Sequence, residues 1–431
     1  MNKLLVIALT VSIPFAACSQ KTNTKADAVI NEKEVTRIET VLASDAFKGR
    51  KVYSPEIDKA ADFIASEFKA AGLVPLNKSN SFLQPFEMVS AKQTAINAEV
   101  NGARFDDTKV LVITSEPTVD ITDKSGFAIE KISKGDEFFS RAVGFVGNGK
   151  NTIILVDTSF GKYFPRLSGF KRSMFKSATS TVFILTAEPV STFHISASND
   201  LSTSKLANVV GMLPGKSKKN EYVIFSGHYD HLGVKKADGA DSIFNGANDD
   251  AAGITAVILL AKYYAALKDN ERTIVFAAFT AEEVGGFGSQ YFSRQFDPAS
   301  VVAMFNIEMI GTESKWGTNS AYITGYEKTN MGSILQKNLT GTEFKFYPDP
   351  YPDQQLFYRS DNATLARLGV PAHTISTSKM DSEPNYHKVS DQVETLDLVN
   401  MTRIIRSIAL SARSIVEGKD TPGRVNTSEL R

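Results

Sequence analysis

Cysteine is almost absent from this chain: Cys18 is the only one among its 431 residues. The sequence therefore offers no disulfide framework, and the fold has to rely on its core. Net charge is absent as well, because Lys plus Arg and Asp plus Glu both number 48. A balanced chain has no sequence-wide field, which argues against nucleic acid or an acidic membrane surface as a partner. The helical zinc pattern His-x-x-x-His does not occur either.

The N-terminal sequence is typical of an export signal, and it is not expected to be part of the fold. The apolar run from Leu4 to Ala17 is too short to span a bilayer comfortably, so residues 1–17 are predicted to be a signal peptide. Small residues directly before Cys18 resemble a bacterial lipobox, which implies lipid attachment there. The alternative is ordinary signal cleavage with an incidental cysteine. We expect an exported protein of the bacterial cell envelope, on the periplasmic face or the cell surface, that touches the membrane only through this anchor.

The residue pattern changes twice along the remaining chain. Residues 18–31 are polar and are predicted to be a flexible tether. Short β-branched segments separated by polar turns predict a mainly β insertion, whereas the segments on either side predict helices, and later strands that alternate with helices. The predicted fold class is α/β, with a mixed, largely parallel sheet sandwiched by helices. The predicted ranges are a main domain at 32–87 and 206–418, the insertion at 88–205 and a C-terminal tail at 419–431.

Chemistry-bearing side chains gather where predicted strands end. The apolar run Tyr222 to Phe225 leads directly into His228 and Asp230, a His-x-Asp pair. The doublet Asp249-Asp250 then precedes an apolar helix. In an α/β sheet the carboxyl ends of the strands are the usual place for a site, so this stretch predicts one half of a metal site.

Further along the chain, the same kinds of residue recur. The strand at 273–280 ends before the doublet Glu282-Glu283, Glu308 lies among apolar residues of another strand, and His387 stands in a turn before the last helix. Adjacent acids project differently, so one of them can bind a metal while its neighbour handles a proton. A buried acid such as Glu308 needs a partner, and a cation can serve. Imidazole and carboxylate ligands without thiolate suit zinc, and also cobalt or manganese.

In this order, the motifs resemble those of the M28 family of co-catalytic dizinc aminopeptidases. They read HYD at 228–230, GANDDAAG at 246–253, AEEVG at 281–285 and YH at 386–387. The segment LASDAFKGR at 42–50 is similar to the N-terminal part of that family. The resemblance covers roughly residues 34–86 and 206–418, and the position of the insertion resembles that of a protease-associated or lid-like domain.

The resemblance implies two zinc ions per chain and a role for each residue. Glu282 would be the general base that takes a proton from a metal-bridging water, and Asp230 would orient the ring of His228. Tyr386 would steady the oxyanion, as in the carboxypeptidase-like branch. The metal ligands would be Asp249 as the bridge, His228 and Glu308 on one ion, and Glu283 and His387 on the other.

One ligand departs from the family pattern, because Glu308 stands where the family usually has Asp. Glu is one methylene longer, so this half of the predicted centre is open to a change in metal affinity or metal choice. Asp250 is interpreted as helix capping and support for the site. His231 and His373 are interpreted as packing or supporting residues rather than ligands. Arg359, Ser360 and Asp361 are candidates for the pocket lining.

The leading hypothesis is a metal-dependent aminopeptidase that removes N-terminal residues from peptide substrates. A glutaminyl cyclase or a carboxypeptidase on the same fold is the first alternative. A non-catalytic peptide-binding protein on a peptidase scaffold is the second, and it is disfavoured because all expected positions carry competent groups. Side-chain specificity and oligomeric state do not follow from the sequence.

Overall fold

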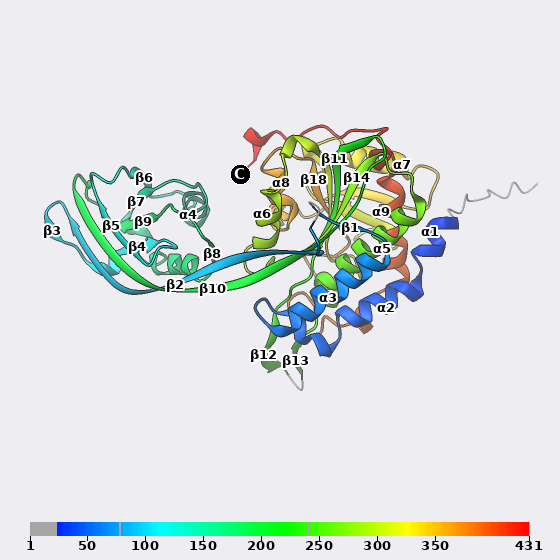
Figure 1. Cartoon of the computed structure of the whole chain (residues 1–431), viewed down its shortest axis with the longest axis horizontal. Coiled ribbons are helices and arrows are strands. Elements are labelled where there is room, and N and C mark those ends of the chain that lie inside the picture. Colours follow the sequence, from blue (N-terminus) through cyan, green and yellow to red (C-terminus); the bar gives the residue numbers. More distant parts are fainter. Residues whose placement is uncertain (1–23, 77–78, 239–240, 431) are drawn as a thin grey trace, which may run out of the picture. The chain divides into compact units, whose positions relative to one another are not determined.

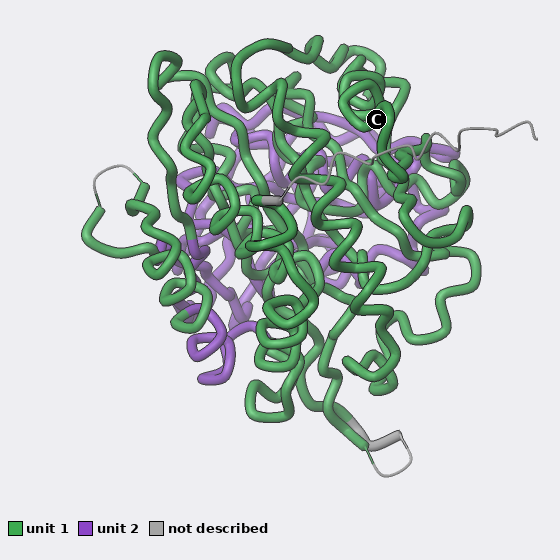
Figure 2. The backbone as a smooth tube through the Cα atoms, turned by 90° about the vertical axis from the view of Figure 1, so that its right-hand side faces the viewer, with its two compact units in different colours: residues 1–50, 62–82, 210–431 green, residues 51–61, 83–209 purple. Residues whose placement is uncertain are grey.

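The computed structural model describes residues 24–76, 79–238 and 241–430. The chain divides into two compact units, which Figure 2 shows in different colours. Unit 1 comprises residues 1–50, 62–82 and 210–431, and unit 2 comprises residues 51–61 and 83–209. The predicted signal peptide and the lipid attachment at Cys18 lie outside the described residues and stay predictions.

A mixed sheet forms the centre of unit 1. Strands β14, β15, β16 and β18 are buried along their whole length and β11 is buried from Val223 onward, as expected for a sheet covered on both faces. In spatial order the strands are β17 (Lys345–Pro348), β16 (Ser320–Ile323), β18 (Ala372–Ser376), β15 (Val301–Ile307), β11 (Lys218–His228), β14 (Arg272–Phe279) and the end of β10 (Phe193–Leu213).

Strands β18, β15, β11 and β14 are parallel to one another, whereas β16 pairs with β18 antiparallel. Helix α5 (Ala252–Leu267) packs on β11, β14 and β15, and α1 (Thr24–Val29), α2 (Glu32–Leu42) and α9 (Leu398–Ser411) contact it. Helix α8 (Asn362–Ala366) packs on β15 and β18 and contacts α6 (Phe287–Ser293), and Figure 1 shows this pair and α5 on different sides of the sheet. The predicted α/β class is confirmed.

Three further helices, one of them only in part, and a hairpin also belong to unit 1. The last helix expected from the sequence, after His387, is divided into α9 and the short α10 (Arg413–Val416). Helix α7 (Met331–Asn338) contacts α9, and α3 (Pro55–Ala70) belongs to unit 1 from Asp62 onward. The hairpin of β12 (Gly233–Asp238) and β13 (Asp241–Phe244) lies between the His-x-Asp pair and the Asp doublet in sequence. By length and apolar composition, residues 247–267 could cross a membrane, but most of them are buried inside unit 1 as core.

The predicted flexible tether at 18–31 is wrong for its second part. Residues Thr24–Val29 form α1, and Ala26 and Ile30 are buried. The guanidinium of Arg406 pairs with Asp27 at 3.0 Å and donates from Nε to the carbonyl of Ile30 at 2.7 Å. The segment is mostly polar, but its few apolar residues are enough to hold it against the rest of unit 1, because α1 packs on α5 and α9. The predicted tail also makes contacts, since Arg424 donates to the carbonyl of Val301.

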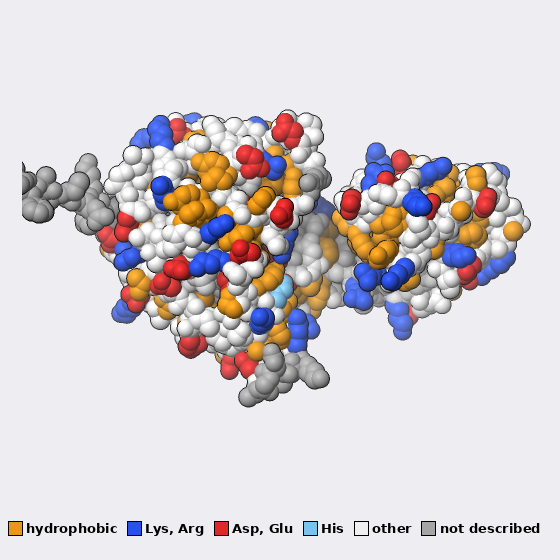
Figure 3. All heavy atoms as spheres, turned by 180° about the vertical axis from the view of Figure 1, so that it is seen from behind, with side chains coloured by type: hydrophobic (Ala, Val, Ile, Leu, Met, Phe, Trp, Pro, Cys, Tyr) orange, Lys and Arg blue, Asp and Glu red, His pale blue; other side chains and the backbone are white. Residues whose placement is uncertain are grey.

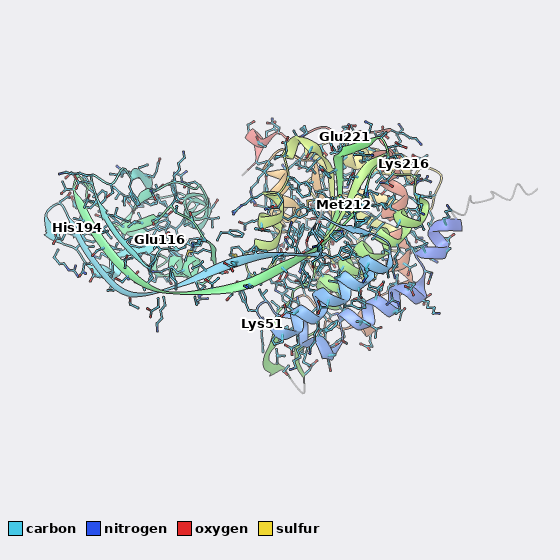
Figure 4. The ribbon with its side chains drawn as sticks, in the orientation of Figure 1. Lys51, Glu116, His194, Met212, Lys216 and Glu221 are labelled. Atoms are coloured by element: carbon cyan, nitrogen blue, oxygen red, sulfur yellow. The ribbon has the colours of Figure 1, made fainter. Side chains whose placement is uncertain are left out.

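Unit 2 is mainly β; its helices include α4 (Phe138–Val146) and the first part of α3. Strands β2 (Leu83–Val100) and β10 form a long antiparallel ladder, and β5 (Thr118–Thr122) pairs with β10. A second sheet contains β4 (Val110–Ile113), β9 (Thr181–Leu185), β7 (Thr152–Val156) and β6 (Ala128–Ile132). Figure 4 labels His194 in unit 2 and Met212 in unit 1, both on β10; His194 is exposed and lies 2.5 Å from Asp120.

Candidate metal centre

The register of the parallel strands brings the predicted ligands to one edge of the sheet. Residue Ser226 of β11 lies opposite Asn306 of β15, and His228 lies opposite Phe279 of β14. His228 therefore ends its strand beside the points where the other two strands end. Glu308 follows β15 by one residue, rather than lying inside a strand as the sequence suggested. The doublet Glu282-Glu283 likewise lies just beyond the end of its strand, because β14 ends at Phe279.

The first group of candidate ligands consists of His228, Asp249 and Glu308. One ligand atom from each lies within 4.8 Å of the others. The Nε2 atom of His228 is 3.2 Å from Oδ1 of Asp249, and both side chains are almost fully buried. This is the trio that the family resemblance assigns to one metal ion.

The second group shares Asp249 and adds residues from three loops. Both His387 contacts measure 3.2 Å, one from Nε2 to Oδ2 of Asp249 and one to Oε2 of Glu283. The structure also brings in His231, whose Nδ1 lies 2.7 Å from Oε1 of Glu283. His231, Asp249 and Glu283 meet the same 4.8 Å limit. The sequence interpretation of His231 as a packing residue missed this placement, although its position three residues after His228 was a signal for it.

The polar atoms of these groups fit a divalent metal. Among the described residues, Oε2 of Glu308 is buried without a hydrogen-bond partner, and the buried Nε2 of His228 and Oε1 of Glu283 face other members of these groups, Asp249 and His231. Buried polar atoms without partners are costly, and cation binding removes that cost. Imidazole nitrogen together with carboxylate oxygen, without sulfur, is a donor set of zinc.

Asp250 and Asp230 hold the backbone around these ligands. The Asp250 carboxylate accepts hydrogen bonds from the amides of His228 (3.1 Å), Gly253 (3.0 Å) and Met309 (3.1 Å), so it joins β11, α5 and the end of β15. Gly253 permits this approach, because a Cβ there would lie 2.2 Å from the carbonyl oxygen of Ile307.

The role predicted for Asp230 differs in its details. The Nδ1 atom of His228 is 3.1 Å from the backbone carbonyl of Asp230, whereas the Asp230 carboxylate is 3.8 Å away. That carboxylate instead accepts the amides of Glu282 (3.0 Å) and Glu283 (3.3 Å). Asp230 therefore orients the His228 ring mainly through its main chain and fixes the turn that carries the glutamate doublet through its side chain.

Two further supporting residues had no role in the sequence interpretation. The Asp391 carboxylate accepts the amides of Asn248 (2.8 Å) and Asp249 (3.1 Å). The buried Arg50 donates to the carbonyls of Leu42, Tyr229, Asn245 and Gly246 at 2.6–2.9 Å. Both residues fix the loops that present the ligands. Their partners are backbone atoms far away in sequence, so no motif spacing points to them.

The carboxyl groups of the site differ in protonation behaviour. Burial raises the pKa of Asp249, but hydrogen bonds from His228 and His387 outweigh burial and bring it below its usual 3.8. Burial also raises the pKa of Glu283, but its hydrogen bonds with His231 and His387 outweigh burial and lower the pKa to about 2. Burial and then the like charges of Glu308 and Asp361 hold the pKa of Glu282 well above 4.5. One acid of the doublet is thus an anion, while its neighbour is suited to hold a proton.

Other predicted residues lie around this centre or away from it. The Tyr386 ring stacks on the His387 ring, with centroids 4.0 Å apart, and burial raises the pKa of Tyr386, so its hydroxyl stays protonated. His373 lies in the core on β18, where Thr329 and the carbonyl of Thr324 occupy its two ring nitrogens. Asp361 is buried, and Arg359 and Ser360 line a cavity beside Glu308. On the face of the molecule drawn in Figure 3, the pale blue that marks histidine is visible at one small spot on unit 1.

Comparisons with known proteins agree with this geometry. Residues 208–412 match the model of peptidase family M28. A probable zinc metalloprotease of Pyrenophora teres f. teres is 36% identical over 108 residues, which cover 25% of this chain and 23% of the relative. A probable leucine aminopeptidase of Trichophyton verrucosum is 28% identical over 204 residues, 45% of this chain and 53% of the relative. The chain thus spans about a quarter to a half of these curated relatives.

The fold has solved counterparts. An aminopeptidase from Aneurinibacillus sp. strain AM-1 superimposes with a TM-score of 0.54 at 17% identity, over 94% of this chain and 98% of the other. At this identity the likeness concerns the fold. The family model, however, matches the segment that carries His228, Asp249, Glu283, Glu308 and His387. The chain therefore carries a domain of peptidase family M28 at residues 208–412.

Proposed function

We propose that this protein is a zinc-dependent aminopeptidase with Glu282 as its general base. The observation that carries the proposal is the pair of ligand groups that share Asp249, with the Glu282 backbone held beside them by Asp230. Zinc would be held by His228, Asp249 and Glu308 on one side and by Asp249, Glu283 and His387 on the other, with two ions per chain. His231 is an additional nitrogen donor on the second side. When bound, such ions polarise a carbonyl and acidify water.

The residues of the chain supply the proton transfers and the orientation. Glu282 takes a proton from the attacking water and passes it to the leaving amine, a role that its raised pKa suits. The protonated hydroxyl of Tyr386, next to the ligand His387, donates a hydrogen bond to the oxygen of the scissile carbonyl as charge builds there. Asp391 and Arg50 keep the loops in register, so that these groups meet the substrate in one geometry. The substrates are peptides with a free N-terminus.

The test compares Glu282→Gln with the wild type on aminoacyl p-nitroanilides. We expect kcat/KM to fall by at least about a hundredfold, because general base catalysis typically contributes that much or more. Glu394→Gln, a change of the same chemistry at an exposed position, is the matched control and should leave activity unchanged. Full activity of Glu282→Gln would reject Glu282 as the base.

Metal analysis tests the other part of the proposal. Mass spectrometry under native conditions should find two zinc ions per chain, and a chelator should abolish the hydrolysis of aminoacyl p-nitroanilides. One ion per chain together with cyclisation of N-terminal glutamine would favour the cyclase alternative. Cleavage from the C-terminus of N-blocked peptides would favour a carboxypeptidase.

A further inference from the structure

A small polar cavity lies directly beside the candidate metal centre. Its volume is about 40 Å³, and Glu308 of the first ligand group forms part of its wall. By the same measure a water molecule needs about 10–15 Å³, so the cavity holds roughly three waters or a short polar group. Hydroxyl groups make up much of its lining, on residues Tyr322, Thr324, Ser360, Thr374, Ser376 and Tyr386.

Most of these hydroxyls are already used inside the fold. Ser360 and Thr374 both accept hydrogen bonds from the side chain of Asn306, at 2.7 and 3.1 Å. Ser376 donates to the carbonyl of Met309, and Tyr322 donates to that of Ser378. Tyr386 is different: its hydroxyl makes no hydrogen bond within the described part of the chain. It is therefore available to a ligand.

Arg359 is the one cation in the lining of this cavity among the described residues. Its only hydrogen bond there runs from Nη1 to Oε1 of Gln354 at 3.1 Å, and no described carboxylate lies within ion-pair distance. Arg50 differs from Arg359 in this respect, because its guanidinium is buried and donates hydrogen bonds to four backbone carbonyls. A guanidinium presents a planar fork of donors that matches a carboxylate. Most of the Arg359 fork is free.

We propose that this cavity recognises a carboxylate of the substrate through Arg359, while Tyr386 keeps its role at the scissile carbonyl. This inference rests on the proposed aminopeptidase function and names its substrate class. A carboxylate can come from an acidic side chain at the substrate N-terminus or from the free C-terminus of a dipeptide. Both sources offer the same chemistry to the arginine fork, and both fit the size of the cavity.

The experiment uses substrate pairs that differ in charge and little in shape. The p-nitroanilides of Glu and Gln, and of Asp and Asn, test the side-chain source. The dipeptide Leu-Ala and its C-terminal amide, with released leucine measured by chromatography, test the C-terminal source. We expect one source to show a preference for the charged member of about 10- to 100-fold in kcat/KM, the range of a hydrogen-bonded charge.

Arg359→Gln should remove this preference and raise KM for the charged substrate, while its effect on the neutral substrate is small. Arg359→Lys should keep part of the preference, because the charge remains and the fork is lost. Arg367→Gln is the matched control: Arg367 is an exposed arginine near Tyr358 and is not part of the cavity lining. General damage to the fold would slow both members of a pair equally, so the ratio reports on recognition.

Equal rates within all pairs, or a preference that survives in Arg359→Gln, would overturn the assignment of the cavity. In either case hydrolysis of leucine p-nitroanilide would leave the proposed aminopeptidase function standing. Failure of the wild-type zinc-loaded protein on every substrate would instead overturn the aminopeptidase function, and the role of the cavity with it.

Discussion

The two halves of the candidate metal centre are built differently. In the first half, His228 and Glu308 stand at the ends of neighbouring parallel strands, and the His228 side chain is 1% exposed. In the second half, Glu283, His231 and His387 come from loops, and the His387 side chain is 35% exposed. Asp249 belongs to both. The comparison teaches that the sheet fixes one half directly, whereas the other half depends on loops that must themselves be held.

The largest effect is expected from removing the shared residue. Asp249→Asn should lower kcat/KM by more than about a hundredfold and release both ions, because even residues that only support metal ligands contribute about 10- to 100-fold. Metal content per chain, measured by mass spectrometry, checks this expectation. Asp241→Asn, a change in the nearby hairpin β13, is the control. A variant that keeps two ions would show that Asp249 is not the bridge.

The next prediction sets the two histidines against each other. His228→Ala and His387→Ala should both lose most activity, but added imidazole should restore only His387→Ala. The reason is access, since a free imidazole can enter the space of a side chain that is 35% exposed and not that of one that is 1% exposed. The measurement is kcat/KM with increasing imidazole. Equal rescue of both variants would break the distinction between the halves.

A smaller effect is expected from removing Arg50, which holds the loops that present the ligands. Arg50→Met should lower the free energy of unfolding by about 3 kcal/mol, because several buried carbonyls lose their donor. Urea unfolding at constant zinc concentration measures it. Arg359→Met, with the same chemistry at an exposed arginine, should change stability by less than about 0.5 kcal/mol. Similar losses in both variants would contradict the role of Arg50.

The smallest effect per pH unit is a pH dependence of stability at Glu39, which interacts electrostatically with Arg50. Glu39 is buried on α2 and accepts a hydrogen bond from Thr255 at 2.7 Å. Burial raises the pKa of Glu39 to about 8 from 4.5. Between these values the folded state keeps a proton that the unfolded state loses, so stability is full below pH 4.5 and falls as pH rises toward 8. The slope is at most about 1.4 kcal/mol per pH unit.

Glu39→Gln should flatten this slope and match the wild type at pH 4.5. Unfolding by urea at several pH values is the measurement, and Glu394→Gln serves again as the exposed control. An unchanged slope in Glu39→Gln would show that another group titrates in this window.

Much of the site was predictable because its residues follow strands. Strand ends in a parallel sheet meet at one edge, so His228, Glu283 and Glu308 could be grouped from the chain order alone. Asp250 was interpreted as support, and the structure gives its carboxylate three backbone amides. The placement of His231 had only its distance from His228 as a signal, and the side-chain partner of Asp230 had none. Both depend on the direction in which a loop side chain points, which no spacing in the sequence determines.

The sequence by itself determined the α/β class, the family resemblance and the kind of chemistry, because these follow from local patterns of apolar residues and from ordered motifs. Only the tertiary structure decided how the ligand loops are held. Arg50 reaches carbonyls up to 196 residues away, and Asp391 reaches the amide of Asp249 across 142 residues. It also decided that, within the described residues, Arg359 makes one hydrogen bond while Arg50 makes four. Backbone amides and carbonyls are the same at every position, so the sequence carries no mark of which of them a distant side chain will bind.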